Sequence, residues 1–509
     1  MPGADPPPST LPLELQSATE LLAALHARRI SAVELLQHHL QRVRELGPAL
    51  NAVVAIDEAG ALAQAARADA ARARGDWLGP LHGLPITIKD AFEVVGMPAT
   101  CGIAALAQHR PAADADLVGA LRRAGAVIFG KTNVPEGAAD HQTYNAVYGL
   151  TRNAWRADRS AGGSSGGAAV AVAAGLSVLD IGSDIGGSIR CPAHFNGVWG
   201  HKASHTLVPL GGHIPPLPPA RSALEMGVAG PLARDARDLA LALDVIAGPE
   251  PPDAKAKCWQ LPPPRHAALA DYRIAVLLDA ADVPLASGYR AALEHWLDAL
   301  ARSGARLTWL RAPPVDAQRA LDLYFDCLFA QAAAHAPPAV QAGFRALAVD
   351  APADDRSFAA RIGRAARLSA PAWFERREQR RALAAQWAAF FDAHDLLLCP
   401  VMSTPAFAHD CSGVDHTAQL QRRVLIDGVA QPYLVNLCWP GLITVADLPA
   451  TAIPTGQFVD GTPVGIQAVG PYLEDRTPLQ FALLVQQRLG GYRVPPSALA
   501  PAPPAAAPR

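Results

Sequence analysis

Apolar residues recur along this chain at two alternating spacings, which predict a succession of helices and strands. Apolar positions three and four residues apart indicate amphipathic helices at about 18–46 (two helices), 57–74 and 116–124. Between them, the short apolar runs 84–89 and 126–130 are typical of buried strands. This alternation favours an α/β fold with a largely covered sheet.

A second unit of the same kind begins after residue 270. It consists of a strand at 272–278, a helix at 288–303 and a strand at 306–310. Residues 317–393 read as helices broken by prolines and carry no glycine motif, so we interpret about 314–393 as a variable helical region over or beside the functional site. Three further strands and a closing helix are predicted at 396–399, 450–454, 464–469 and 477–489.

Size and charge restrict the classes of protein to consider. The chain has 509 residues, of which 50% are hydrophobic and 18% charged, so it can bury a large core, and its length alone suggests two or three domains. The formal net charge of −2 gives no electrostatic footprint for nucleic acid or for an anionic membrane.

The compartment follows from what the sequence lacks. It has no uninterrupted apolar run of about 18 residues, as a membrane span needs, and no basic segment followed by an apolar one, as a secretory signal needs. Its seven cysteines are dispersed without a CxxC pair, which fits reduced thiols. We therefore expect a soluble, cytoplasmic protein. The Pro/Ala-rich ends, 1–15 and 495–509, are expected to be disordered tails.

The most distinctive stretch is GGSSGGAAVAVAAGLSVLDIGSDIGGSIRCP, from Gly162 to Pro192. A Gly/Ser tract is usually a flexible linker, but this one opens directly into small apolar residues that suit a tightly packed, buried helix. About nine helical residues rise roughly 14 Å, and the extended segment that follows spans roughly 20 Å. A helix that runs out and a strand that returns would bring residues 183–188 back to Ser164.

Two further features of the sequence carry chemistry. In the glycine turn, Ile185–Ser188, Gly186 and Gly187 permit backbone conformations closed to other residues. The amides of these four residues could then converge on an oxyanion, whereas the alternative is a plain turn that carries Ser188. Upstream, Lys89 ends the apolar strand LPITIK. Such a lysine is most often a solvated charge, and it serves as a base only if burial lowers its pKa.

Two competing motifs are weaker. Gly162–Gly166 matches G-x-S-x-G, the nucleophile elbow of α/β-hydrolases, but that elbow follows a strand, and the preceding AWRADRSA is polar and irregular. A phosphate-binding loop would require a following G-K-[ST], which is absent.

Taken together, the motifs resemble the amidase signature family. GGSSGGAAVAVAAG and GSDIGGSIRCPAHFNGVWGHK resemble its serine- and glycine-rich signature, LHGLPITIKD its lysine block, KTNVPE the segment that follows, and LPATAIPTG and GTPVGIQAVG its closing strands. The resemblance covers about 15–490, with 250–390 matching only in general layout. It implies a single large α/β/α domain over 16–494, with a mixed, mostly covered central sheet and a core at about 50–250 and 394–490, in place of several domains.

The resemblance also implies roles for residues by motif position. Ser188 would be the nucleophile, Ser164 a bridging serine in a cis-peptide setting, and Lys89 the base of a Ser-Ser-Lys triad. The amides of Ile185, Gly186, Gly187 and Ser188 would form the oxyanion hole. Neutral Lys89 would take a proton from Ser164, which takes one from Ser188 as it attacks, and water would hydrolyse the acyl-enzyme. No cofactor or metal is implied, and no histidine is assigned a role.

Substrate recognition is less defined. Tyr144 and Asn145, which precede the serine loop, and Phe195, which follows it, are candidate substrate-binding residues, with core packing as the alternative for each. The chain departs from the family pattern in two places: Ser183 stands where threonine is common in GTDxGGS, and ASHTLVPLGGH follows GHK where many members have PTxGxVP. The second departure concerns the substrate pocket rather than the chemistry.

The expected function is hydrolysis of the C–N bond of a small carboxylic amide, and anilides, carbamates and small esters are compatible with the same machinery. One alternative is the amidase (glutaminase) component of a tRNA-dependent amidotransferase, and another is a catalytically silent scaffold of the same fold. The near-neutral charge and the divergent segment after GHK favour a stand-alone amidase. The expected partner is the small amide itself, with no nucleic acid and no membrane; the oligomeric state is open, a homodimer included.

Overall fold

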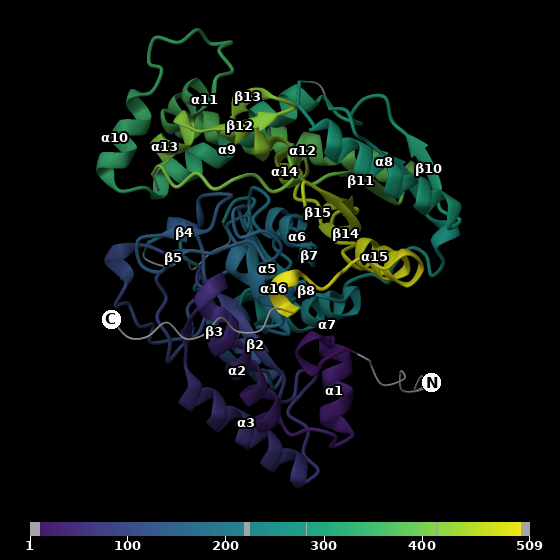
Figure 1. Ribbon diagram of the computed structural model, residues 1–509. Helices are drawn as coiled ribbons and strands as arrows, with labels where there is room; N and C mark the ends of the chain where they lie inside the picture. Colours follow the sequence, from purple (N-terminus) through teal and green to yellow (C-terminus); the bar gives the residue numbers. More distant parts are fainter. Residues whose placement is uncertain (1–10, 218–223, 281, 414–415, 500–509) are drawn as a thin grey trace.

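The computed structural model describes residues 11–217, 224–280, 282–413 and 416–499. At its centre lies a mixed sheet of eleven strands in the order β1-β3-β2-β6-β8-β7-β14-β15-β11-β9-β10 (Figure 1). The strands are β1 (Val53–Ile56), β2 (Pro85–Lys89), β3 (Val127–Thr132), β6 (Leu179–Asp184), β7 (Trp199–Lys202), β8 (Val228–Ala233), β9 (Arg273–Val276), β10 (Arg306–Trp309), β11 (Leu396–Pro400), β14 (Ala450–Val459) and β15 (Thr462–Val469). Two small pairs lie outside it: β4 (Tyr144–Asn145) with β5 (Gly149–Leu150), and β12 (Arg423–Ile426) with β13 (Val429–Pro432).

Helices flank this sheet, which makes the fold an α/β fold, as the sequence predicts. They are α1 (Ala18–His26), α2 (Ala32–Leu50), α3 (Glu58–Ala73), α4 (Asp116–Arg123), α5 (Gly166–Ala173), α6 (Arg190–Asn196), α7 (Ala236–Ile246), α8 (Ser287–Arg302), α9 (Ala317–His335), α10 (Pro338–Ala346), α11 (Phe358–Ala366), α12 (Ala370–Ala393), α13 (His416–Gln421), α14 (Cys438–Thr444), α15 (Arg476–Leu489) and α16 (Pro496–Leu499). Figure 1 shows α1–α3 at one end of the molecule and α9–α13 at the other.

The order of strands divides the sheet along the chain. All strands on one side of the β7–β14 boundary come from residues 53–233, and all strands on the other side come from 273–469. The two parts meet where β7 pairs antiparallel with β14, with Lys202 opposite Ala450 and His201 opposite Thr451. The sheet is therefore assembled from an early and a late half of the sequence that join at one seam.

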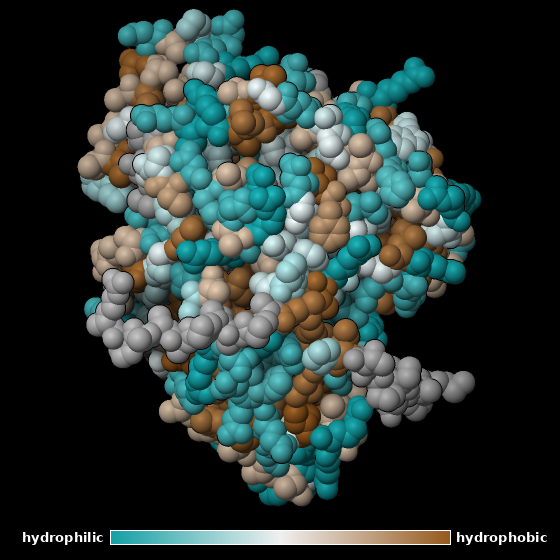
Figure 2. All heavy atoms as spheres, viewed as in Figure 1, coloured by the Kyte–Doolittle hydropathy of each residue, from teal (hydrophilic) through white to brown (hydrophobic). Residues whose placement is uncertain are grey.

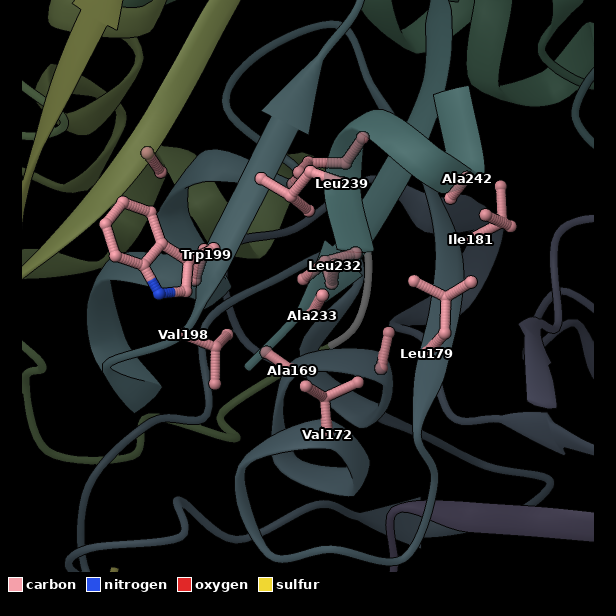
Figure 3. Close-up of a cluster of buried hydrophobic side chains, with 14 of the residues drawn as sticks. Ala169, Val172, Leu179, Ile181, Val198, Trp199, Leu232, Ala233, Leu239 and Ala242 are labelled. Atoms are coloured by element: carbon pink, nitrogen blue, oxygen red, sulfur yellow. The ribbon is translucent and has the colours of Figure 1, made fainter. Parts of the chain in front are cut away.

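The small-residue segment after the serine tract is a buried helix, as predicted. Every residue of α5 is buried, because alanines and glycines let the helix lie close to its neighbours. In Figure 3, Ala169 and Val172 of this helix lie in the apolar cluster with Leu179 of β6 and Leu239 of α7. The chain returns from α5 through β6, which pairs parallel with β2. The tract GGSSGG is thus part of the core and not a linker.

Several elements were not expected from the sequence. Strand β8 (VAGPLA) contains glycine and proline, which are depleted in strands, yet it lies antiparallel between β6 and β7. Strand β7 (WGHK) is short and half polar, and no periodicity marks it. Both are strands because their neighbours in the sheet satisfy their backbone groups, a tertiary effect that local pattern does not contain.

The chain is ordered further toward its ends than the sequence predicts. Residues Leu13–Leu15 form a 3₁₀ helix with Leu15 buried, and Ala498 of α16 is buried as well, although both segments were expected in disordered tails. Hydrogen bonds from two arginines hold these segments in place: Arg234 donates to the Leu15 carbonyl at 3.3 Å, and Arg42 donates to the Ala498 carbonyl at 2.5 Å. The remainder of the expected tails, 1–10 and 500–509, lies outside the described residues.

The surface and the thiols add two observations. On the face shown in Figure 2, hydrophilic and hydrophobic residues are interspersed. No helix among the described residues is both long enough and apolar enough to cross a bilayer. All seven cysteines are unpaired.

Candidate active site

The ends of two parallel strands bring a lysine and two serines together. Lys89 is the last residue of β2, Ser183 lies near the end of neighbouring β6, and Ser164 precedes α5. The Lys89 Nζ lies 2.6 Å from Ser164 Oγ, 3.0 Å from Ser183 Oγ and 3.3 Å from the Ser183 carbonyl oxygen. The Gly163–Ser164 peptide bond is cis. The sequence prediction that helix and strand return to Ser164 is confirmed.

Lys89 is completely buried, so it is not the solvated strand-end charge that such a residue usually is. Burial lowers its pKa from 10.5 to about 7, because an ammonium ion is poorly solvated there. The nearby Cys101, Asp184 and Asp180 oppose this effect and favour the charged form. The side chain is therefore close to the balance point between amine and ammonium at neutral pH.

A backbone hydrogen bond connects Ser188 to the loop that contains Ser164. The amide of Ser165 donates to the Ser188 carbonyl at 3.0 Å, which fixes the serine loop against the glycine turn. Ser188 retains 8% exposure, against 1% for Ser164. Its hydroxyl makes no hydrogen bond to another residue in the described part of the chain, so the Ser164–Ser188 link is open in this structure. Catalytic hydrogen bonds commonly tighten only when substrate is bound.

An ion pair holds the glycine turn. The Asp184 carboxylate accepts from the Gly187 amide at 2.8 Å, from the Ile189 amide at 3.0 Å and from Arg190 Nη2 at 2.9 Å. Although burial raises the pKa of Asp184, the Arg190 guanidinium outweighs it and holds that pKa well below its ordinary value. Both side chains are fully buried, and Arg190 also donates to Thr444 Oγ1 at 2.9 Å.

The Asp184 carboxylate engages one of the four amides that were predicted as oxyanion donors. The Gly187 amide is committed to Asp184, whereas the amides of Ile185, Gly186 and Ser188 donate to no other atom among residues the structure describes. Tyr324 Oη donates to the Ile185 carbonyl at 3.3 Å. Because C=O and N–H of a trans peptide point in opposite directions, this bond directs the Gly186 amide away from Tyr324.

Apolar and aromatic side chains from the second half of the chain close around the turn. A Cβ added at Gly186 would lie 2.8 Å from Leu437 Cδ2 and 2.9 Å from Tyr324 Oη, and one added at Gly187 would lie 3.1 Å from Pro440. A larger residue at either position would have to displace these side chains, and at Gly187 the φ of +100° also favours glycine. Tyr324 belongs to α9, so the helical region predicted beside the site does reach it.

The three predicted substrate-binding residues all make contacts with other parts of the fold. The Asn145 amide donates to Asn133 Oδ1 at 2.8 Å and its oxygen accepts from the Tyr148 amide at 2.7 Å, which holds a turn. Phe195 has no exposed surface and packs edge-on against Phe407. Tyr144 is 8% exposed, and Arg422 donates to its hydroxyl within a buried cluster that includes Asp140.

Sequence reasoning missed two contributors to this site. The first is the Asp184–Arg190 pair, whose signal was the opposite charges that flank the motif DIGGSIR. The second is His213, whose Nε2 lies 2.9 Å from Ser183 Oγ. It ends the segment ASHTLVPLGGH, and the departure of that segment from the family pattern was the signal that could have pointed to it. Across the described ranges, no cluster of three or more His, Cys, Asp or Glu side chains is arranged to hold a metal ion.

Comparisons with known proteins agree over nearly the whole chain. A family model described as Amidase matches residues 34–479. The chain is 33% identical over 483 residues to the indoleacetamide hydrolase of Bradyrhizobium diazoefficiens, covering 93% of this chain and 86% of that protein. It is 31% identical over 493 residues to one of the subunits of the glutamyl-tRNA(Gln) amidotransferase of Symbiobacterium thermophilum, covering 92% and 96%. The solved structure of 6-aminohexanoate cyclic dimer hydrolase superposes with a TM-score of 0.78 at 26% identity, covering 96% of this chain and all of that one.

Proposed function

This chain belongs to the amidase signature family, whose members hydrolyse C–N bonds, and from that premise we propose that it cleaves a small carboxylic amide through an acyl-enzyme on Ser188. The observation that carries the proposal is the buried Lys89, whose Nζ lies 2.6 Å from Ser164 Oγ. The loop that contains Ser164 is in turn hydrogen-bonded to the backbone of Ser188. A buried amine with a pKa near 7 is a competent base at neutral pH. No other titratable residue is needed in the relay.

The reaction proceeds in two halves. Lys89 accepts the proton of Ser164 as Ser164 accepts that of Ser188, and Ser188 Oγ forms a bond to the carbonyl carbon. The amides of Ile185, Gly186 and Ser188 stabilise the oxyanion. The relay then returns the proton to the departing nitrogen, the C–N bond breaks, and the acyl group stays on Ser188. Water adds to the ester by the same relay and releases the acid.

We propose that the substrate carries an apolar or aryl group. Leu437, Tyr324 and Pro440 lie 2.8 to 3.1 Å from the positions that a Cβ would take at Gly186 and Gly187. Contacts with these side chains would bury a hydrocarbon group of the substrate without leaving a charge unpaired. A relative 33% identical to this chain is named for its action on indoleacetamide, an aryl-substituted primary amide. Aryl acetamides are therefore the first compounds to assay, followed by anilides, carbamates and small esters.

The main alternative is the glutaminase component of an amidotransferase, because another relative is named as part of a glutamyl-tRNA(Gln) amidotransferase. Glutamine presents a carboxylate and an ammonium group, and Leu437, Tyr324 and Pro440 carry no charge that could pair with either. The purified chain should therefore hydrolyse aryl amides without any partner protein. Glutaminase activity that appears only with added partner proteins would favour the alternative.

Labelling with a fluorophosphonate, followed by intact mass and peptide mapping, tests the nucleophile. We expect a single adduct on Ser188, lost in Ser188→Ala. An adduct on Ser164 would reverse the two serine roles and revive the nucleophile-elbow interpretation. A wild-type protein that neither forms an adduct nor hydrolyses the amide panel would point to the silent scaffold.

A further inference from the structure

A chain of hydrogen bonds continues from Lys89 away from Ser164. Ser183 Oγ, 3.0 Å from Lys89 Nζ, lies 2.9 Å from His213 Nε2. The other ring nitrogen of His213, Nδ1, lies 2.9 Å from the Pro215 carbonyl oxygen. His213 is buried, and its ring packs edge-on against Phe92 at 5.0 Å between centroids. The imidazole is thus held between one backbone oxygen and one hydroxyl.

The hydrogen-bonding partners of His213 determine where the protons lie along this series of hydrogen bonds. A carbonyl oxygen only accepts, so Nδ1 carries the proton and donates to Pro215. Burial lowers the pKa of His213 to about 4, and the Lys89 charge lowers it as well, so the ring is neutral at neutral pH. In a neutral imidazole protonated at Nδ1, Nε2 is an acceptor. The Ser183 hydroxyl must therefore donate to His213.

This direction determines how Lys89 is used. Because the Ser183 hydroxyl proton is engaged by His213, the lone pairs of Ser183 Oγ face Lys89 and accept from it. A neutral amine has two N–H donors and one lone pair. Its two donors go to Ser183 Oγ at 3.0 Å and the Ser183 carbonyl at 3.3 Å. The lone pair is left for the hydroxyl of Ser164, whose Oγ lies at 2.6 Å and carries the proton that the base must take.

We propose that His213 is a positioning residue for the base: through the hydroxyl of Ser183 it orients the Lys89 amine so that its lone pair faces Ser164. This inference rests on the proposed acyl-enzyme function. Without an acceptor at 213, the Ser183 hydroxyl turns its proton to the Lys89 lone pair and competes with Ser164 for it. The two places where the chain departs from the family pattern, Ser183 and the segment after GHK, meet in this one hydrogen bond.

Two substitutions separate the acceptor from the bulk of the ring. His213→Leu removes the acceptor, whereas His213→Gln supplies a side-chain oxygen that can accept from Ser183. The readout is the rate constant of fluorophosphonate labelling of Ser188 at pH 8, with thermal unfolding as the check on folding. We expect His213→Leu to slow labelling about 10- to 100-fold, as misplacement of a catalytic group does, and His213→Gln to restore most of the rate.

A double-mutant cycle then tests the path through Ser183. We expect Ser183→Ala to slow labelling, and His213→Leu to add nothing further in that background, because the link is already broken. The matched control is His39→Leu, another buried histidine, which lies on α2 with no hydrogen-bonding partner among described side chains and should label at the wild-type rate.

Three outcomes would overturn the inference alone. The first is labelling of His213→Leu at the wild-type rate. The second is equal slowing of labelling by His213→Leu and His213→Gln, and the third is a double variant in which the two losses of labelling rate multiply. The last two outcomes would indicate a merely structural role. By contrast, a wild-type protein that is not labelled at Ser188, or a Lys89→Met variant labelled at the wild-type rate, would overturn the proposed function and the inference with it.

Discussion

Replacing Lys89 by methionine should make the protein less active and, at neutral pH, more stable. Methionine has a similar length and no charge to bury. In the unfolded chain the lysine is protonated up to its ordinary pKa of 10.5, whereas in the folded protein it loses its proton near pH 7. Between these values unfolding takes up a proton, so the free energy of unfolding of the wild type rises with pH. The methionine variant lacks this dependence.

The magnitude follows from the two pKa values. The lowered pKa of Lys89 reduces the free energy of unfolding by about 4 kcal/mol at pH 7 and by about 2 kcal/mol at pH 9. Against this, the substitution removes the contacts of the amine with Ser164 and Ser183, worth about 1 kcal/mol each. The variant should therefore be more stable than the wild type by about 2 kcal/mol at pH 7 and of nearly equal stability at pH 9.

Urea unfolding followed by tryptophan fluorescence, at pH values from 6 to 9, measures this difference, and the nine tryptophans provide the signal. Because other titrating groups are common to both proteins, the pH dependence of the difference isolates Lys89. A difference that stays constant over this range would mean that Lys89 keeps the same charge in both states. Lys89 would then not be the neutral base of the reaction.

Three other outcomes are expected. Ser188→Ala should lower kcat for an aryl amide about 10⁴-fold or more and leave the thermal midpoint unchanged; calorimetry checks the fold, and substantial turnover would exclude Ser188 as the nucleophile. The pH profile of wild-type kcat/KM should fall tenfold per pH unit below about 7, where Lys89 becomes protonated, and stay flat above; a profile level from pH 5 to 9 would argue against a lysine base. Arg190→Met should cost about 3–5 kcal/mol of stability, because Asp184 is left buried without its counter-charge; an unchanged urea midpoint would show that the pair does not hold the turn.

Local pattern was sufficient for the elements that carry the chemistry. The segment 164–188 predicts a buried helix and a returning strand, and the structure has α5 and β6 at these positions. The prediction succeeds because small and β-branched residues already restrict what such a segment can pack against. Strand β8 was not predictable, since only its neighbours β6 and β7 make a Gly- and Pro-containing segment extended.

The site was predictable in its residue types but not in its electrostatics. A motif identifies Lys89, yet only the packed structure shows that its side chain is fully buried and that this burial lowers its pKa. Of the four amides expected to converge at the glycine turn, the one at Gly187 donates to Asp184, so we propose the other three as oxyanion donors. Asn145 and Phe195 lie near the motifs in sequence, but proximity along the chain does not determine whether a side chain faces substrate or core. His213 lies 30 positions beyond Ser183 along the chain.

The seam between β7 and β14 has a consequence for how the protein is made. Lys89, Ser164 and Ser188 all leave the ribosome in the early half of the chain, whereas Leu437, Pro440 and β14 are synthesised roughly 10–40 s after β8 at ordinary elongation rates. During that interval the edge of β7 has no strand to pair with, and unpaired edges are templates for aggregation. The nascent chain thus carries the proposed nucleophile and base beside an open sheet edge, and we expect its yield to depend on how well that edge is shielded until β14 is synthesised.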